Sequence, residues 1–152
     1  MASVLRGSHQ AKIDEKGRLK LPTTFRSQMD ATWKTASVYL TCDDSNGTYV
    51  RVYPLPVWEG VEEKLLKMPS TDLARRRFQR WTSLYGQEGE IDSQGRVLIP
   101  PQLRDPALMQ GDVVVLGSGD FLEVWNLERF TSQTDTEKLT VDDHNRLSEF
   151  GI

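Results

Sequence analysis

A chain of 152 residues can form one domain or two closely packed halves. Charged residues make up 27% and apolar residues 38% of the chain, as in an ordinary soluble protein, and no apolar run approaches the roughly 18 residues of a membrane span. The start of the chain has no signal-peptide core, so we expect a cytosolic protein. A lone cysteine, Cys42, excludes an intrachain disulfide and a cysteine-based zinc site.

The net charge of −3 conceals an uneven distribution. Residues 1–76 hold 12 Lys and Arg against 9 Asp and Glu, whereas residues 77–152 hold 7 against 13. Within residues 1–26, six basic side chains face only Asp14 and Glu15. A local basic patch of this kind is what contact with phosphate requires, whatever the total charge.

The first half of the chain is predicted to hold four strands and one short helix. A strand over 5–13 enters a tight turn, its hairpin partner covers 18–21, and a helix follows over 22–29. Further strands are expected over 37–41 and 49–53. The acidic cluster 43–47 between them is typical of a hairpin tip, because it ends in Asn-Gly and lacks the spacing of a calcium loop.

The first turn has a defined chemistry. The Asp14 carboxylate can accept hydrogen bonds from backbone N–H groups two residues on, and Gly17 supplies a positive φ without a Cβ clash. Arg18 follows the glycine and is offered to solvent beside the turn. Asp14 and Arg18 are expected to form an ion pair. The pair either only fixes the hairpin, or it also holds the guanidinium in the orientation that binds a ligand.

Two helices are expected in the middle of the chain. Residues 56–68 place apolar side chains three and four apart, and Asp72 can cap a second helix that runs to Tyr85. Four arginines crowd the polar side of this second helix: Arg75, Arg76, Arg77 and Arg80. They are candidate DNA contacts, but a solvated face or a subunit contact is the favoured reading.

The second half repeats the first. Residues 91–104 match residues 13–26 at an offset of 78 (92 minus 14), and six of the fourteen positions are identical. The second turn therefore contains Asp92, Gly95 and Arg96. Strands are expected at 112–117 and 121–125, followed by a helix from Leu127 and a polar tail in which Leu147 and Phe150 are the main apolar anchors.

Taken together, these motifs resemble the MraZ family of bacterial transcription regulators, whose two halves each carry a swapped-hairpin unit of the AbrB type. The likeness covers nearly the whole chain in order. It rests on Arg6-Gly7, both Asp-x-x-Gly-Arg turns, residues 53–59 (Tyr-Pro-Leu-Pro-Val-Trp-Glu), Arg75-Arg76-Arg77 and residues 121–125 (Phe-Leu-Glu-Val-Trp).

The resemblance implies an α+β, β-rich fold in which two swapped-hairpin half-units form one pseudo-dimeric, double-psi-like β-barrel with flanking helices. The expected divisions are a first half-unit over 1–55, connecting helices over 56–86, a second half-unit over 87–127 and a C-terminal helix or tail over 128–152.

The resemblance also implies sequence-specific binding to double-stranded DNA, with Arg18 as the main reader. Lys12, Lys16 and Lys20 would add charge, and Arg6, Arg96 and, weakly, His9 extend the candidate surface. It implies a homo-oligomeric ring, an octamer or similar, that binds short tandem repeats. It also implies a nucleoid-associated repressor of the division and cell-wall gene cluster and of its own promoter. Trp58, Trp81 and Trp125 are further candidate contacts, or core residues.

The first copy is expected to carry the DNA contact and the second to be mainly structural. Lys12, Lys16 and Lys20 correspond to Glu90, Gln94 and Leu98 in the second copy, and the acidic residues of the second turn are expected to face only Arg96 and Arg104.

An enzyme and a protein-binding module are the two alternative classes of function. Enzyme readings are poor, since Asp14 and Asp92 each have an arginine four residues on, which keeps a carboxylate ionised, and no catalytic, metal or cofactor motif stands out. We therefore expect no catalysis, no metal, no cofactor, no small-molecule substrate and no membrane. The rival is an assembly or protein-binding module that uses the same turns.

Overall fold

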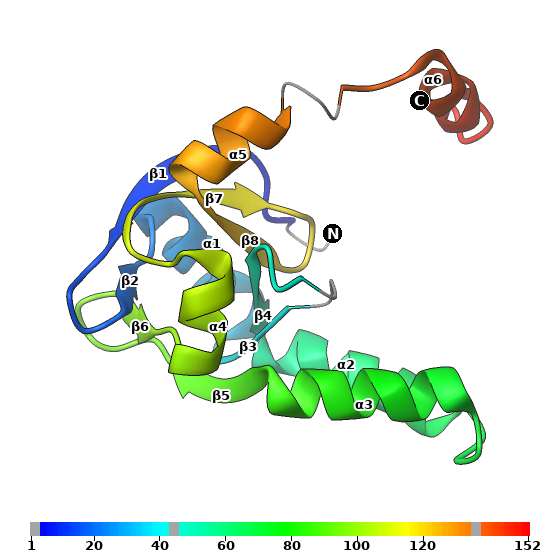
Figure 1. The fold of residues 1–152 in the computed structure, drawn as a ribbon, viewed down its shortest axis with the longest axis horizontal. Coiled ribbons are helices and arrows are strands. Elements are labelled where there is room, and N and C mark those ends of the chain that lie inside the picture. The colour runs from blue at the N-terminus through cyan, green and yellow to red at the C-terminus, as the bar shows by residue number, and fades with distance from the viewer. Residues whose placement is uncertain (1–3, 43–45, 135–137) are drawn as a thin grey trace.

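The computed structural model describes residues 4–42, 46–134 and 138–152, so most of the predicted hairpin tip at 43–47 lies outside the described residues. The chain is α+β, with a nearly closed β-barrel flanked by helices (Figure 1). The first half contains β1 (Ser8–Ile13), β2 (Arg18–Lys20), α1 (Thr23–Trp33), β3 (Ser37–Thr41) and β4 (Val50–Pro54). The second contains β5 (Gly86–Glu90), β6 (Arg96–Leu98), α4 (Pro101–Ala107), β7 (Gly111–Gly117) and β8 (Leu122–Asn126).

The two halves exchange strands rather than folding separately. The first strand of each half pairs with the third strand of the other, β1 with β7 and β5 with β3, and the second strands β2 and β6 pair with each other. The strand order is β5-β3-β4-β8-β7-β1-β2-β6, with every ladder in the described residues antiparallel. The turn from β5 into β6 nearly closes the barrel. The α+β, β-rich barrel fold that the resemblance implied is confirmed.

The barrel interior is filled by the inward side chains of the strands and by one face of each short helix. Leu19 on β2 and Val97 on β6 are opposite each other in the ladder and are almost fully buried. Helix α1 contributes Phe25 and Met29, and α4 contributes Leu103 and Ala107. Alternation along β2 and β6 therefore turns their remaining side chains outward.

Helix α1 is longer than its sequence suggested. It continues past Met29 to Trp33 and ends where Lys34 adopts a left-handed conformation, with its N–H bonded to Asp30 O at 2.9 Å. Phe25, Met29 and Trp33 are spaced four apart, so Trp33 extends the same core-facing stripe by one turn. No glycine or proline interrupts this segment.

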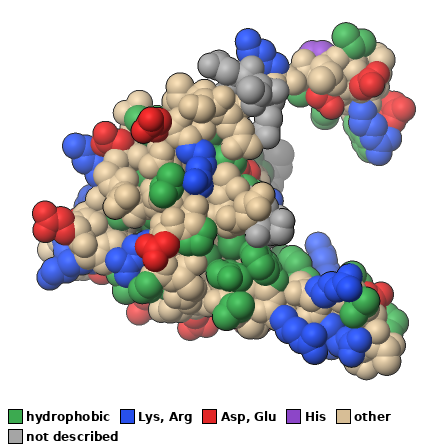
Figure 2. Space-filling model, in the orientation of Figure 1, with side chains coloured by type: hydrophobic (Ala, Val, Ile, Leu, Met, Phe, Trp, Pro, Cys, Tyr) green, Lys and Arg blue, Asp and Glu red, His purple; other side chains and the backbone are tan. Residues whose placement is uncertain are grey.

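Helices α2 (Leu55–Leu66) and α3 (Leu73–Leu84) form a helical hairpin, here called the arm, that projects from the barrel (Figure 1). Asp72 caps α3 as predicted, accepting bonds from the N–H groups of Ala74 and Arg75 at 2.9 and 3.2 Å. Figure 2 shows Lys and Arg side chains gathered on the surface of the arm toward its free end.

Two helices follow the barrel strands. Helix α5 (Leu127–Thr134) packs on β7 and β8, whereas α6 (Val141–Ser148) lies apart from the barrel (Figure 1). None of the helices in the described ranges combines the length and apolar content that crossing a membrane requires.

Candidate nucleic-acid interface

The first hairpin turn is closed by Asp14. Its Oδ1 accepts hydrogen bonds from the backbone N–H groups of Lys16 and Arg18, both at 2.9 Å. Its Oδ2 accepts a bond from Arg18 Nε at 2.7 Å. Gly17 has φ +84°, and its N–H bonds Asp14 O at 3.0 Å. The carboxylate therefore fixes both the turn and the arginine that leaves it.

The second turn repeats this geometry. Asp92 Oδ1 accepts bonds from the N–H groups of Gln94 and Arg96 at 2.8 and 2.9 Å, and Arg96 Nε lies 3.3 Å from Oδ2. Gly95 has φ +79°. In both turns the charge-assisted bond uses Nε, and the two Nη groups of each guanidinium are its further donors.

Both aspartates are held ionised. The backbone N–H of Arg18 is the main cause that lowers the pKa of Asp14, with smaller contributions from the Arg18 guanidinium and the Lys16 N–H. The pKa of Asp92 is lowered chiefly by the backbone N–H of Arg96 and then by that of Gln94. Such carboxylates are unsuited to proton transfer near neutral pH and suited to orienting an arginine.

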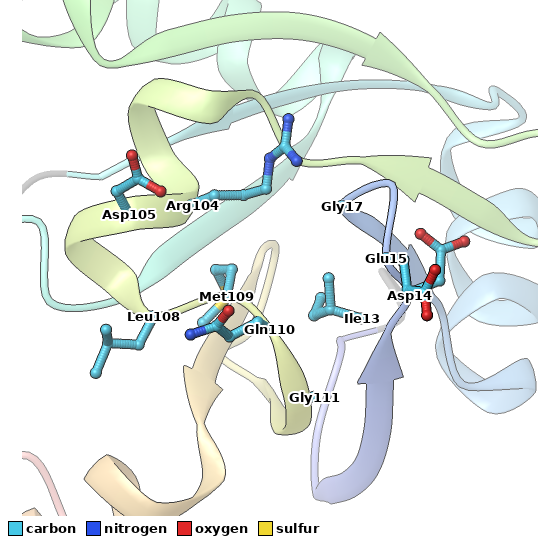
Figure 3. A pocket seen from close by; sticks show the side chains of 10 residues that line it. All are labelled: Ile13, Asp14, Glu15, Gly17, Arg104, Asp105, Leu108, Met109, Gln110 and Gly111. Carbon is cyan, nitrogen blue, oxygen red and sulfur yellow. The ribbon is translucent and has the colours of Figure 1, made fainter.

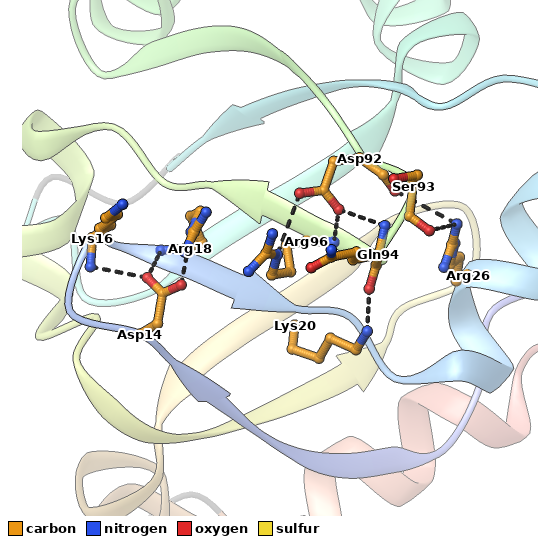
Figure 4. A network of polar contacts seen from close by, with 9 residues as sticks. All are labelled: Asp14, Lys16, Arg18, Lys20, Arg26, Asp92, Ser93, Gln94 and Arg96. Carbon is orange, nitrogen blue, oxygen red and sulfur yellow. Dashed lines mark hydrogen bonds and ion pairs between the residues drawn. The ribbon is translucent and has the colours of Figure 1, made fainter.

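The exchange of strands brings the two turns together. Pairing of β2 with β6 sets Arg18 opposite Leu98 and Lys20 opposite Arg96. Since Leu19 and Val97 between them point inward, the four residues Arg18, Lys20, Arg96 and Leu98 share one outward surface, which we call the paired-hairpin face. Figure 4 shows the arginines of both turns along it. The side chains of Arg18 and Arg96 are 31% and 28% exposed.

The arginines that close each repeat also cross between halves. Arg26 of the first copy donates to Ser93 O in the second turn at 3.2 Å, and Arg104 of the second copy donates to Lys16 O in the first turn at 3.4 Å. Lys20 also reaches the second turn, donating to Gln94 O (Figure 4). Each turn is therefore supported by side chains from the other repeat.

This crossing corrects one prediction. The acidic residues of the second turn do not face only Arg96 and Arg104, because Arg104 lies at the first turn while Arg26 and Lys20 lie at the second. The positive charge of the first copy is thus shared between both turns. Local sequence could not show this, since the bond between Arg26 and Ser93 spans 67 positions.

A hollow of about 570 Å³ lies beside the first turn, between the β1–β2 hairpin and the segment from α4 to β7. Figure 3 shows Arg104 reaching along it toward Gly17. The carboxylates of Asp14, Glu15 and Asp105 also line the hollow and outnumber this guanidinium. The charge balance does not favour an anion there, and Arg104 serves to support the turn.

The remaining predicted basic residues surround the paired-hairpin face unequally. Lys16 is exposed at the tip of the first turn, and Arg6 is exposed before β1. Lys12 lies 3.9 Å from Asp112 on β7, and both side chains are well exposed, so this pair offsets part of its charge. His9 is exposed, with its ring edge-on to Phe25 at 5.1 Å.

The tryptophans named as candidate contacts belong to the interior of this chain. Trp58 and Trp125 are 4% and 8% exposed, and Trp58 stacks on Tyr39 at 4.5 Å. Trp81 is half-buried and donates its Nε1 to Cys42 O at 2.9 Å. Trp58 and Trp81 join the arm to the barrel, and Trp125 on β8 packs against Phe130 of α5.

Sequence reasoning missed Leu98 as part of the site. It is 46% exposed in the midst of the basic side chains. Its position on β6 gave the signal, since Val97 and Ile99 alternate with it and take the inward positions.

The duplicated, exchanged hairpins and the matched Asp–Arg turns define a swapped-hairpin protein with an arginine-bearing outer face. Sequence comparison then gives its family. The family profile described as "MraZ protein, putative antitoxin-like" matches residues 4–81 and 86–148. The chain belongs to the MraZ family.

Relatives that align over most of their length support the same family assignment. A protein of Acidobacterium capsulatum is 41% identical over 149 residues, covering 98% of this chain and 100% of the relative. One of Koribacter versatilis is 37% identical with the same coverage, and one of Legionella pneumophila is 38% identical over 87% of this chain and 86% of the relative. Each bears the name transcriptional regulator MraZ.

Proposed function

We propose that this chain is a transcription regulator that binds duplex DNA through the paired-hairpin face, with Arg18 as the main reader and Arg96 as a second contact. The observation that carries the proposal is that Arg18, Lys20 and Arg96 share one outward surface although they come from two repeats. The names of the full-length relatives support the same class of function.

The proposed contact follows from the geometry of the guanidinium. Asp14 holds Arg18 through Nε, and the two Nη groups can donate two parallel bonds to guanine O6 and N7 or to a phosphate. A side chain already fixed in one orientation loses less entropy on binding. Lys12, Lys16, Lys20 and Arg6 would add attraction to the phosphate backbone that does not depend on sequence.

One paired-hairpin face covers few base pairs, so the proposal includes assembly. A homo-oligomeric ring would present several faces to short tandem repeats, and linked contacts raise a modest affinity per site. The proposed targets, from the resemblance, are the promoter of the division and cell-wall gene cluster and the regulator's own promoter. Repression at the nucleoid is the proposed outcome.

A gel shift against the DNA upstream of the chain's own gene tests this function. Wild-type protein should shift the fragment, and more weakly at higher salt, while Arg18→Ala should lose the shift and keep its oligomeric mass. Arg77→Ala, an exposed arginine on the arm, is the matched control and should bind normally.

The rival class of function predicts the reverse. If the turns serve a protein partner, Arg18→Ala should leave the gel shift unchanged. That result would remove the DNA-reading role and favour an assembly or protein-binding module.

A further inference from the structure

Helix α6 is specified at both ends by local chemistry. Thr140 and Asp143 form a capping box, with Thr140 Oγ1 accepting the Asp143 N–H at 3.1 Å and Asp143 Oδ2 accepting the Thr140 N–H at 2.9 Å. At the other end Gly151 has φ +77°, and the Ile152 N–H bonds Leu147 O at 3.2 Å. The chain encodes a defined helix here.

Among the described residues, this helix stands apart from the other helices and strands, as Figure 1 shows. Phe150 and Ile152 are 67% and 80% exposed, and Leu147 on the last turn is half-buried. An isolated helix of eight residues is marginal in water even with good caps. The Phe150 ring carries the Arg146 guanidinium at 4.7 Å on one side and is otherwise largely exposed, so it is accessible to a partner.

The arm carries a surface of matching character. A groove of about 190 Å³ runs between α2 and α3 where they meet the barrel, with Tyr39, Trp58, Leu65 and Leu66 among its lining residues. Leu66 at its edge is 66% exposed. The groove therefore offers apolar and aromatic surface to a side chain such as phenylalanine.

The acidic start of α6 has a basic counterpart on the rim of the groove, while Glu62 lies in the groove lining itself. Helix α6 begins with Asp142 and Asp143. Arg76 and Arg80 are exposed on α3, each three residues before a groove-lining residue, Gln79 or Ser83. Residues three apart on a helix are neighbours, so these arginines border the groove.

We infer that α6 of one copy docks in the α2–α3 groove of a second copy, with Phe150 entering the groove and the acidic first turn facing Arg76 and Arg80. Within one chain the barrel lies between the arm and α5, from which α6 extends (Figure 1). A head-to-tail contact of this kind closes into a ring when its rotation permits. The inference specifies the homo-oligomer of the proposed function, and it leaves β2 and β6, on the side away from the arm's free end, open to DNA.

The test is the mass of the full-length protein in solution, measured by light scattering without DNA. Wild-type protein should be an oligomer, and Phe150→Ser and Leu66→Ser should each lower the mass toward that of a single chain. Leu139→Ser and Leu108→Ser are matched controls, because they remove exposed apolar side chains that lie outside α6 and do not line the groove. Both should keep the wild-type mass.

Mixing the two interface variants distinguishes a second copy from docking within one chain. Phe150→Ser keeps an intact groove and Leu66→Ser keeps an intact α6, so an equimolar mixture should form a heterodimer that neither variant forms alone. Unchanged masses of both variants, or a mixture that stays monomeric, would overturn the inference. Because no DNA is present, failure of Arg18 to read DNA would not affect the outcome.

The charge match is tested separately. Asp142→Lys should lower the oligomeric mass, and adding Arg76→Glu to the same chain should restore at least part of it. If the combined variant is no more oligomeric than Asp142→Lys alone, Asp142 does not face Arg76.

Discussion

Arg104 donates Nη1 to Lys16 O across 88 positions of sequence, so the first hairpin turn rests on the last arginine of the second repeat. Arg26 makes the corresponding contact with Ser93 in the second turn. The two candidate DNA-contacting arginines are therefore positioned jointly by both halves, and a change in one repeat should be felt in the turn of the other.

Removing either closing arginine should loosen the opposite turn. We expect Arg26→Ala to raise the amide exchange rates of Gln94 and Arg96 in the second turn. We expect Arg104→Ala to raise those of Lys16 and Arg18 in the first turn. In both variants the affected turn loses a hydrogen bond donated by the other repeat. Hydrogen exchange resolved by residue measures this. Faster exchange confined to the turn of the mutated repeat would contradict the crossed arrangement.

The glycines of the two turns should differ in their tolerance of a side chain. Both have positive φ, but a Cβ on Gly17 would lie 2.4 Å from Arg104 Nη1, whereas one on Gly95 would lie 3.0 Å from Arg26 Nη1. The left-handed backbone alone costs a non-glycine residue about 1–2 kcal/mol. Urea unfolding should show Gly17→Ala to be at least as destabilising as Gly95→Ala; a neutral Gly17→Ala would contradict the packing of Arg104 beneath the turn.

The aspartate bonds predict how stability depends on pH. The pKa of Asp14 is lowered from its ordinary 3.8, so the folded protein binds fewer protons than the unfolded chain in the acidic range. The stabilisation is complete well above that ordinary value and is lost as pH falls through it and then through the lowered pKa. Urea unfolding from pH 7 downward should therefore show a shallower acid dependence for Asp14→Asn than for wild-type protein. Equal acid dependence in the two proteins would mean that the pKa of Asp14 is the same in the folded and in the unfolded chain.

Phosphate contact by the first turn should appear in the salt dependence of DNA binding. Lys16 is exposed at the tip of that turn, and replacing it by Gln should reduce the slope of log K against log[salt] by about 1. Lys64→Gln on the arm is the control and should leave the slope unchanged. A slope unaffected by Lys16→Gln would place the duplex elsewhere.

Local chemistry explains what could be predicted from sequence. The two turns follow from the spacing of Asp, Gly and Arg over five residues, and the caps of α3 and α6 likewise lie within a few residues of the atoms they satisfy. The fold followed from the repeat and from the resemblance it supported. Each of these features depends on short segments, in which side-chain type and backbone preference agree.

The contacts that were missed depend on the exchange of strands. The side chains of Arg26, Lys20 and Arg104 reach partners 66 to 88 positions away, and a reading that takes each repeat by itself assigns them to the wrong turn. Trp58 and Trp125 were similarly ambiguous, since an aromatic side chain on a helix or strand end serves equally as core or as contact. Only the packed barrel buries them.

We propose that one duplex is held by the paired-hairpin face, with Arg18 as its main reader. The most direct measurement is the dissociation constant for the promoter DNA of Arg18→Ala, Arg96→Ala and the double variant, at one fixed salt concentration. We expect a loss of about 1–3 kcal/mol in binding free energy, roughly 5- to 150-fold in affinity, for Arg18→Ala, and a smaller loss for Arg96→Ala. Wild-type affinity in Arg18→Ala would show that Arg18 does not read DNA, and an equal or larger loss in Arg96→Ala would show that the first turn is not the main contact.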